Sequence, residues 1–116
     1  MTDAPTLGAV IEAGDSTFRD LVLEASGPVL VDFSAAWCAP CRLVEPLLAE
    51  LAVTYRGRVR VVRVDTDAHP ATAAAFGVVS IPTLSVFSSG EVVRTAIGAR
   101  PKPELVALIE DVLAAR

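Results

Sequence analysis

The chain has 116 residues, which is enough for one domain with one hydrophobic core. Lys and Arg number 10 against 14 Asp and Glu, so the formal net charge of −4 argues against nucleic acid or an anionic membrane as the main partner. Hydrophobic residues make up 53% of the chain, but no apolar run approaches the ~18 residues that a membrane span needs. These residues are therefore expected to fill a compact core.

The first third of the chain shows a strand, a helix and a second strand. Residues Thr6–Glu12 predict a short strand, which Gly14 ends. Asp15 or Ser16 can then cap a helix whose apolar residues recur at spacings of three and four: Phe18, Leu21, Val22 and Ala25. Val29–Phe33 is nearly all apolar and β-branched, which is typical of a strand covered on both faces in a parallel sheet.

The middle of the chain continues the alternation. The apolar pattern predicts a second helix over Leu43–Tyr55 and a third strand over Val59–Val64. A short Ala-rich helix over Pro70–Phe76 follows, and Gly77 ends it.

The last part of the chain predicts a hairpin and a final helix. Ile81–Phe87 is a strand that begins near a proline, Ser88–Gly90 is a turn, and Glu91–Ile97 returns beside it. Pro101 and Pro103 open a helix with an apolar face formed by Leu105, Val106, Leu108, Ile109 and Val112. The order β-α-β-α-β-α-β-β-α predicts an α/β fold in which helices cover both faces of the sheet. We expect a single domain over residues 1–116.

Both cysteines lie in the pentapeptide Trp37-Cys38-Ala39-Pro40-Cys41, between the second predicted strand and the second predicted helix. Cysteines three apart at the start of a helix lie about one turn apart on the same side. The helix N-terminus favours a thiolate over a thiol, and Pro40 suits the first helical turn. This pattern predicts a reversible dithiol/disulfide pair in which Cys38 attacks and Cys41 resolves.

Two other interpretations of the cysteine pair remain at this point. Cys38 and Cys41 can be buried structural thiols, or they can be half of a zinc site that a second subunit completes, because the only histidine, His69, is far along the chain. Residues Met1–Gly8 lack a basic stretch followed by an apolar one, so no secretory signal is expected. A cytoplasmic location follows as the expectation, and structural disulfides are rare there.

Three separated features resemble the thioredoxin family, and the resemblance covers about Thr6–Ala115. They are Val31-Asp32-Phe33 leading into the cysteine motif, then Ile81-Pro82-Thr83, then Gly98 after the last strand. The resemblance implies a thioredoxin fold, with a five-stranded mixed sheet in the order 1-3-2-4-5 flanked by four helices. It also implies a protein-disulfide reductase, a thiol-disulfide oxidoreductase that exchanges disulfides through Cys38 and Cys41.

The same resemblance carries expectations about partners and cofactors. The substrates are disulfide-containing proteins, and an NADPH-dependent flavoprotein thioredoxin reductase is expected to reduce the oxidised protein again. No bound cofactor and no metal are expected beyond the Cys38–Cys41 disulfide. A monomer that binds neither nucleic acid nor membrane is expected.

Asp32 is the most unusual residue of the second predicted strand, since a carboxylate inside an apolar run should be buried and its pKa raised. The resemblance makes it a catalytic acid below Cys41 that takes or returns a proton. The alternative is an aspartate that faces outward at the strand end. Three departures from the family pattern surround it: Ala39 replaces a common glycine, Ser34 a common tryptophan, and Arg63 a common lysine. Arginine does not readily give up its charge, so proton handling near Asp32 is expected to differ in detail.

The resemblance also implies a surface that binds substrate. Pro82 is expected to follow a cis peptide bond that exposes the backbone of Ile81 to an extended substrate segment, although a proline can also simply start a strand. Trp37, otherwise an ordinary core aromatic, is expected to join a flat apolar patch. The expected substrate-binding residues are Trp37, Ala39, Pro40, Ile81, Pro82 and Gly98, with Ala99 beside them. Arg42 either helps to hold the thiolate or is an exposed helix charge.

Alternative functions come from two classes. One is a related oxidase or isomerase of exported proteins, which the reduction potential would distinguish. The other is a binding module whose apolar patch holds a partner regardless of redox state, and this module would keep its function with both cysteines replaced by serine.

Overall fold

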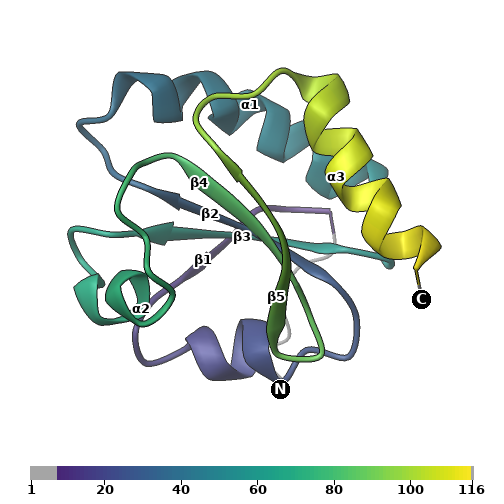
Figure 1. The fold of residues 1–116 in the computed structure, drawn as a ribbon, viewed down its shortest axis with the longest axis horizontal. Coiled ribbons are helices and arrows are strands. Elements are labelled where there is room, and N and C mark those ends of the chain that lie inside the picture. The colour runs from purple at the N-terminus through teal and green to yellow at the C-terminus, as the bar shows by residue number, and fades with distance from the viewer. Residues whose placement is uncertain (1–7, 116) are drawn as a thin grey trace.

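The structure is a computed structural model that describes residues 8–115. Five strands form one mixed sheet in the order β1-β3-β2-β4-β5 (Figure 1), so the predicted strand order is confirmed. β3 runs parallel to β1 and β2, whereas β4 runs antiparallel to β2 and β5. The strands are β1 Ile11–Ala13, β2 Val29–Ser34, β3 Arg60–Asp65, β4 Thr83–Ser88 and β5 Glu91–Ile97; the helices are η1 Arg19–Leu23, α1 Ala39–Thr54, α2 Pro70–Ala75 and α3 Lys102–Ala114.

The sheet separates two hydrophobic cores, because α1 and α3 cover one face while η1 and α2 cover the other (Figure 1). Alternate residues of the central strand β2 point to opposite faces, so Leu30 packs under α1 and α3 while Val31 and Phe33 pack under η1 and α2. Every residue of β2 is buried. The strand that leads into the cysteine motif is therefore held from both sides.

The strand boundaries differ from the predictions at two positions. β1 begins at Ile11 rather than at Thr6, because Gly8 has a φ of +82° and the chain turns there before it joins the sheet. Thr6 itself lies outside the described residues. β4 begins at Thr83 rather than at Ile81, since Pro82 has no N–H to give to the ladder.

One helix follows its prediction and another differs in type. α1 begins at Ala39, so Pro40 and Cys41 lie in its first turn, which confirms the prediction for Pro40, and the apolar run from Leu43 forms the rest of the helix. The first helix, η1, is a short π-helix in which the N–H of Glu24 donates to the carbonyl of Arg19 at 2.8 Å. No helix within residues 8–115 is long and apolar enough to cross a bilayer.

Asp15 caps a different helix from the one predicted. η1 has no side-chain cap, and the carboxylate of Asp15 instead accepts from the backbone N–H and the hydroxyl of Thr72, at 2.9 and 2.6 Å. Thr72 lies in the first turn of α2, whose own flanking residue, His69, makes no side-chain cap. The loop after β1 therefore supplies the acceptor that α2 lacks.

Candidate active site

The two cysteines lie where β2 passes into α1. Cys38 is the N-cap residue of α1, and the backbone N–H of Cys41 donates to the Cys38 sulfur at 3.2 Å. A disulfide joins the two residues, whose Cα atoms are 5.3 Å apart. Cys41 is fully buried, whereas Cys38 retains a small exposed fraction of 3%. In the reduced state, this N–H and the positive end of the helix both favour a thiolate at Cys38.

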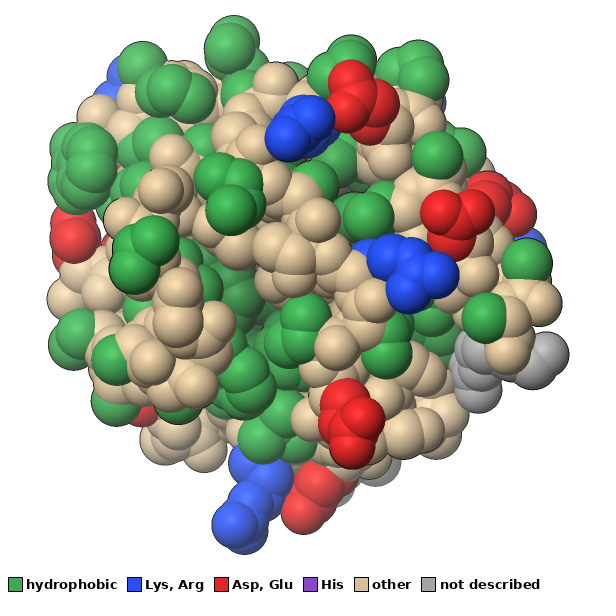
Figure 2. Space-filling view, viewed as in Figure 1, with side chains coloured by type: hydrophobic (Ala, Val, Ile, Leu, Met, Phe, Trp, Pro, Cys, Tyr) green, Lys and Arg blue, Asp and Glu red, His purple; other side chains and the backbone are tan. Residues whose placement is uncertain are grey.

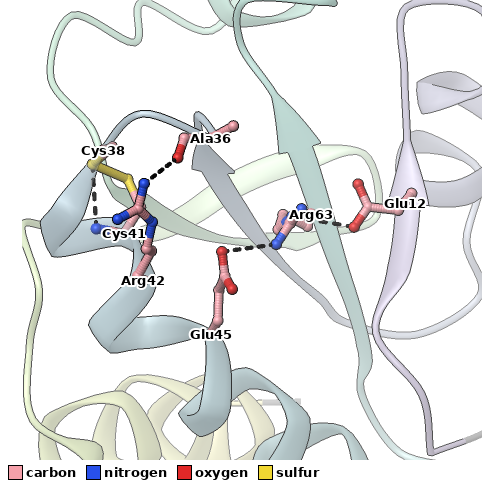
Figure 3. A network of polar contacts seen from close by, with 7 residues as sticks. All are labelled: Glu12, Ala36, Cys38, Cys41, Arg42, Glu45 and Arg63. Carbon is pink, nitrogen blue, oxygen red and sulfur yellow. Dashed lines mark hydrogen bonds and ion pairs between the residues drawn. A yellow bond between two sulfur atoms is a disulfide. The ribbon is translucent and has the colours of Figure 1, made fainter.

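The loop before the cysteines is braced from α1. The guanidinium Nη2 of Arg42 donates to the carbonyl oxygen of Ala36 at 3.0 Å (Figure 3). Arg42 thus returns to the loop that precedes Cys38 and is exposed on the surface beside the disulfide. Arg42 is therefore an exposed helix charge, and its guanidinium is bound to the carbonyl of Ala36 in the loop before Cys38 (Figure 3).

Asp32 is fully buried on the face of the sheet that α1 covers, as the sequence predicted. Neither of its carboxylate oxygens has a hydrogen-bonding partner among the described residues. Burial raises the pKa of Asp32 to about 7; the Arg63 guanidinium opposes this rise, and the carboxylates of Glu45 and Glu12 add to it. A carboxyl group with such a pKa can both accept and return a proton near neutral pH.

A row of ionisable side chains crosses three strands at this position. The register pairs Glu12 of β1 with Arg63 of β3, and Arg63 with Asp32 of β2. Arg63 makes two ion pairs, from Nε to Glu12 Oε2 at 3.1 Å and from Nη1 to Glu45 Oε2 on α1 at 3.0 Å (Figure 3). The cation next to Asp32 is therefore engaged by two other carboxylates.

Trp37 is 67% exposed, so it is not a core aromatic. Its indole N–H donates to Asp67 Oδ2 at 2.7 Å, in the loop between β3 and α2. That loop is itself fixed: the N–H of Asp67 donates to Asp65 Oδ1 at 2.9 Å, and the N–H of Thr66 donates to the carbonyl of Ser34 at 2.8 Å. The exposed indole is thereby held in one orientation beside Cys38.

The opposite side of the disulfide is formed by the turn before β4. The peptide bond between Ile81 and Pro82 is cis, which confirms the prediction. Ile81 packs against the buried cluster of Ala35, Cys38 and Cys41, and the N–H of Gly98 donates to the carbonyl of Pro82 at 2.8 Å. Gly98 has a φ of +95°, a conformation that favours glycine.

The predicted substrate-binding residues lie at different depths around this point. Trp37, Ala39 and Pro40 are exposed, Ile81 and Gly98 are half-buried, and Pro82 is buried. In Figure 1, the start of α1 and the turn before β4 both lie at the left-hand end of the molecule. Figure 2 shows the same view, and hydrophobic side chains gather along this left-hand edge.

His69 lies away from this arrangement. Its ring packs against Gly14, and its Nδ1 accepts the backbone N–H of Asp15 at 3.2 Å. Within residues 8–115 there is no group of three or more His, Cys, Asp or Glu side chains that could hold a metal ion.

Three residues of the site were not found from the sequence: Glu12, Glu45 and Asp67. A signal existed for two of them. Glu45 is four residues after Cys41 and so lies on the same side of α1. Asp67 follows the carboxyl end of β3, which in a parallel sheet lies next to the carboxyl end of β2, where the cysteine motif begins. Glu12 depends on the register of β1 against β3, which the sequence pattern did not fix.

The fold and the redox-active pair define a class of protein, the thiol-disulfide oxidoreductases. The family model described as Thioredoxin matches residues 9–111. The chain is 52% identical over 91 residues to Thioredoxin 1 of Synechococcus elongatus, covering 78% of this chain and 85% of that protein. It is 45% identical to Thioredoxin 1 of a Nostoc species, covering 90% of this chain and 97% of that one.

A third relative is a longer protein. The bifunctional thioredoxin reductase/thioredoxin of Mycobacterium leprae is 43% identical over 113 residues, which cover 97% of this chain and 25% of that protein. These matches extend over most of the chain, so the chain belongs to the thioredoxin family. It is a protein-disulfide reductase that acts by dithiol/disulfide exchange through Cys38 and Cys41.

Proposed function

We propose that Cys38 is the attacking thiolate and Cys41 the resolving thiol of this reductase. The Cys38 sulfur attacks a substrate disulfide, forms a mixed disulfide and releases the first substrate sulfur as a thiolate. Cys41 then attacks the Cys38 sulfur and releases the second substrate sulfur. The observation that carries this assignment is the position of Cys38 at the N-cap of α1, where its sulfur accepts the N–H of Cys41 and the residue is 3% exposed, whereas Cys41 lies inside the helix and is fully buried.

Asp32 is proposed as the proton carrier of the second step. Cys41 has to lose its thiol proton before its sulfur can form a bond, and a buried carboxylate with a pKa near 7 is suited to take that proton at neutral pH. Its burial on the α1 face and its two unpartnered oxygens within the described chain support this role. The proton then passes from Asp32 to solvent, so the carboxylate is restored.

The docking surface for substrate is proposed to combine Trp37, Ala39, Pro40, Ile81, Pro82 and Gly98. Trp37 supplies an exposed apolar ring whose orientation is fixed by its hydrogen bond to Asp67. Ile81 lies two residues before Thr83, the first residue of β4, and is therefore outside the strand ladder, where an extended segment of a substrate protein can pair with its backbone. The hydrogen bond from the N–H of Gly98 to the carbonyl of Pro82 holds this turn in place.

The proposed setting is a cytoplasmic monomer without a bound cofactor or metal, which binds neither nucleic acid nor membrane. An NADPH-dependent flavoprotein thioredoxin reductase is proposed to reduce the Cys38–Cys41 disulfide after each turnover. The relative from Mycobacterium leprae supports this partner, since its printed name joins a thioredoxin reductase and a thioredoxin in one protein.

The test is the equilibrium potential of the Cys38–Cys41 pair against glutathione, followed by the fluorescence of Trp37, the only tryptophan. We expect a potential well below the glutathione poise, because a reductase has to drive its substrates toward thiols. A potential well above that poise would contradict the proposal and favour the oxidase. Retained function after replacement of both cysteines by serine would favour the binding module.

A further inference from the structure

Arg63 lies beside the buried Asp32 but does not bond to it. The two residues are paired neighbours on adjacent parallel strands, which lie about 4.8 Å apart in a sheet. The guanidinium nevertheless contacts Glu12 at 3.1 Å and Glu45 at 3.0 Å, while both oxygens of Asp32 lack a hydrogen-bonding partner in the described part of the chain. The guanidinium next to this buried carboxyl is thus paired with other groups, with Glu45 and, by proximity but without a hydrogen bond at Nε, with Glu12.

The charged and titratable groups that face Asp32 come from three elements. Arg63 faces it from β3, with Glu12 of β1 on the far side of the guanidinium. Cys41 and Glu45 belong to α1, one helical turn apart on the same side of the helix (Figure 3). On the remaining side, the paired residue of β4 is the apolar Leu84.

The position of Arg63 decides how readily Asp32 holds a proton. A guanidinium bonded to a buried carboxylate stabilises the charged form and lowers its pKa by 1–3 units in typical cases. Asp32 in such a pair would remain ionised at neutral pH and would be a weak base toward a thiol. The side chains of Glu45 and Glu12 are 43% and 64% exposed, so both partners of the guanidinium are in contact with solvent, unlike the buried Asp32.

We propose that Glu45, assisted by Glu12, is a positioning residue that holds Arg63 away from Asp32 and so keeps this buried carboxyl able to take up the Cys41 proton. The inference rests on the proposed role of Asp32 as proton carrier. As the Cys41 sulfur bonds to the Cys38 sulfur, the thiol proton of Cys41 passes to the Asp32 carboxylate, and the substrate sulfur leaves Cys38 with the bonding electron pair. Glu45 touches neither sulfur and acts only through Arg63.

The first arm of the test follows the carboxyl carbon of Asp32 by NMR as the oxidised protein is titrated. Glu45→Gln is expected to shift the Asp32 midpoint by about one pH unit toward lower pH, since the guanidinium loses one of its two anchors. Glu50→Gln is the matched control, because Glu50 lies on the same helix and pairs with Lys102 at 2.7 Å. An equal midpoint in the Glu45→Gln and Glu50→Gln proteins would overturn the proposal.

The second arm separates an effect through Arg63 from the charge of Glu45 itself. Glu45→Gln is repeated in an Arg63→Gln background, and its shift is expected to fall to less than half of the shift in the natural background. Equal shifts in the two backgrounds would overturn the positioning role.

The third arm measures the rate at which Cys41 resolves a mixed disulfide at pH 7. Glu45→Gln is expected to slow this step several-fold, whereas Glu50→Gln is expected to leave it unchanged. If the Asp32 midpoint moves while the rate and its pH profile do not, the proton-carrier role of Asp32 is wrong and the positioning of Arg63 stands. An unmoved midpoint overturns the positioning whatever the rate does.

Discussion

The two faces of the sheet bury different chemistry. Under η1 and α2, the rings of Phe18, Phe33, Phe76 and Phe87 form a cluster with centroid distances of 5.1–6.3 Å, in tilted and T-shaped contacts. Under α1 and α3, aliphatic side chains and the ring of Tyr55 share the interior with the carboxyl of Asp32. The aromatic face can be optimised for packing alone, whereas the α1 face has to tolerate a group whose ionised form is poorly solvated. The comparison indicates that the buried ionisable group is confined to the α1 side of β2, whereas hydrophobic packing is shared by both sides.

The largest expected effect comes from the chemistry of the α1 face. Cys38→Ser should reduce disulfide exchange to the uncatalysed background, because a hydroxyl does not replace the attacking thiolate. The free energy of unfolding should stay within about 1 kcal/mol of the reduced natural protein, since only one small side chain is altered. Turnover of a disulfide-containing protein and urea unfolding measure the two quantities. Residual turnover well above background would show that Cys38 is not the attacking residue.

On the aromatic face, Phe87→Ala should lower stability and leave the redox chemistry unchanged, the reverse of Cys38→Ser. Phe87 is almost fully buried and packs against Phe18 and Phe76, so its truncation should lower the free energy of unfolding by roughly 3–5 kcal/mol. The potential of the cysteine pair should not change. Val53→Ala, at a position that is 59% exposed, is the control and should cost less than about 0.5 kcal/mol. A shift in potential for Phe87→Ala would break the proposed separation of the two faces.

Asp32→Asn tests what the buried carboxyl costs in stability. Its pKa is about 7 in the folded protein against 3.8 for an ordinary aspartate in water, so the folded state holds the proton more tightly than the unfolded state does. The corresponding stability is fully present below pH ~4 and is lost as the pH rises through about 7. The natural oxidised protein should therefore lose on the order of 4 kcal/mol more than Asp32→Asn between pH 4 and pH 8.

Urea unfolding of both oxidised proteins at the two pH values measures this difference. The comparison between pH values cancels the packing change that the asparagine itself introduces. An equal change in the free energy of unfolding for the two proteins would mean that Asp32 titrates with an ordinary pKa. The two faces would then differ only in the side chains that they pack.

The smallest expected effect concerns the edge of the site. Asp67→Ala removes the acceptor of the Trp37 indole, so kcat/KM for a protein disulfide should fall about five-fold, equivalent to about 1 kcal/mol, with most of the change in KM. Asp67→Asn keeps an acceptor oxygen and should retain most of the activity. If both variants behave alike, the orientation of Trp37 does not contribute to docking.

The sequence predicted those parts of the molecule that depend on local pattern. The apolar run around Asp32, the spacing of Cys38 and Cys41, and the hairpin after Ser88 are local features, and the family resemblance supplied the strand order and the cis bond before Pro82. Glu12 and Glu45 were missed because they meet Arg63 only after two strands have paired and α1 has packed on them. The π-type winding of η1 was missed for the same reason, since apolar spacings of three and four do not distinguish it from an α-helix.

The contact between Asp15 and Thr72 links two segments that lie 57 positions apart in the chain. α2 has six residues, too few to be stable as an isolated helix, and its first-turn N–H depends on the Asp15 carboxylate. During synthesis the Asp15 loop leaves the ribosome before α2 does, so the cap is already available when the helix that needs it emerges. A circular permutant opened between Asp15 and Ser16 would reverse that order, and α2 would be made long before the residue that completes it.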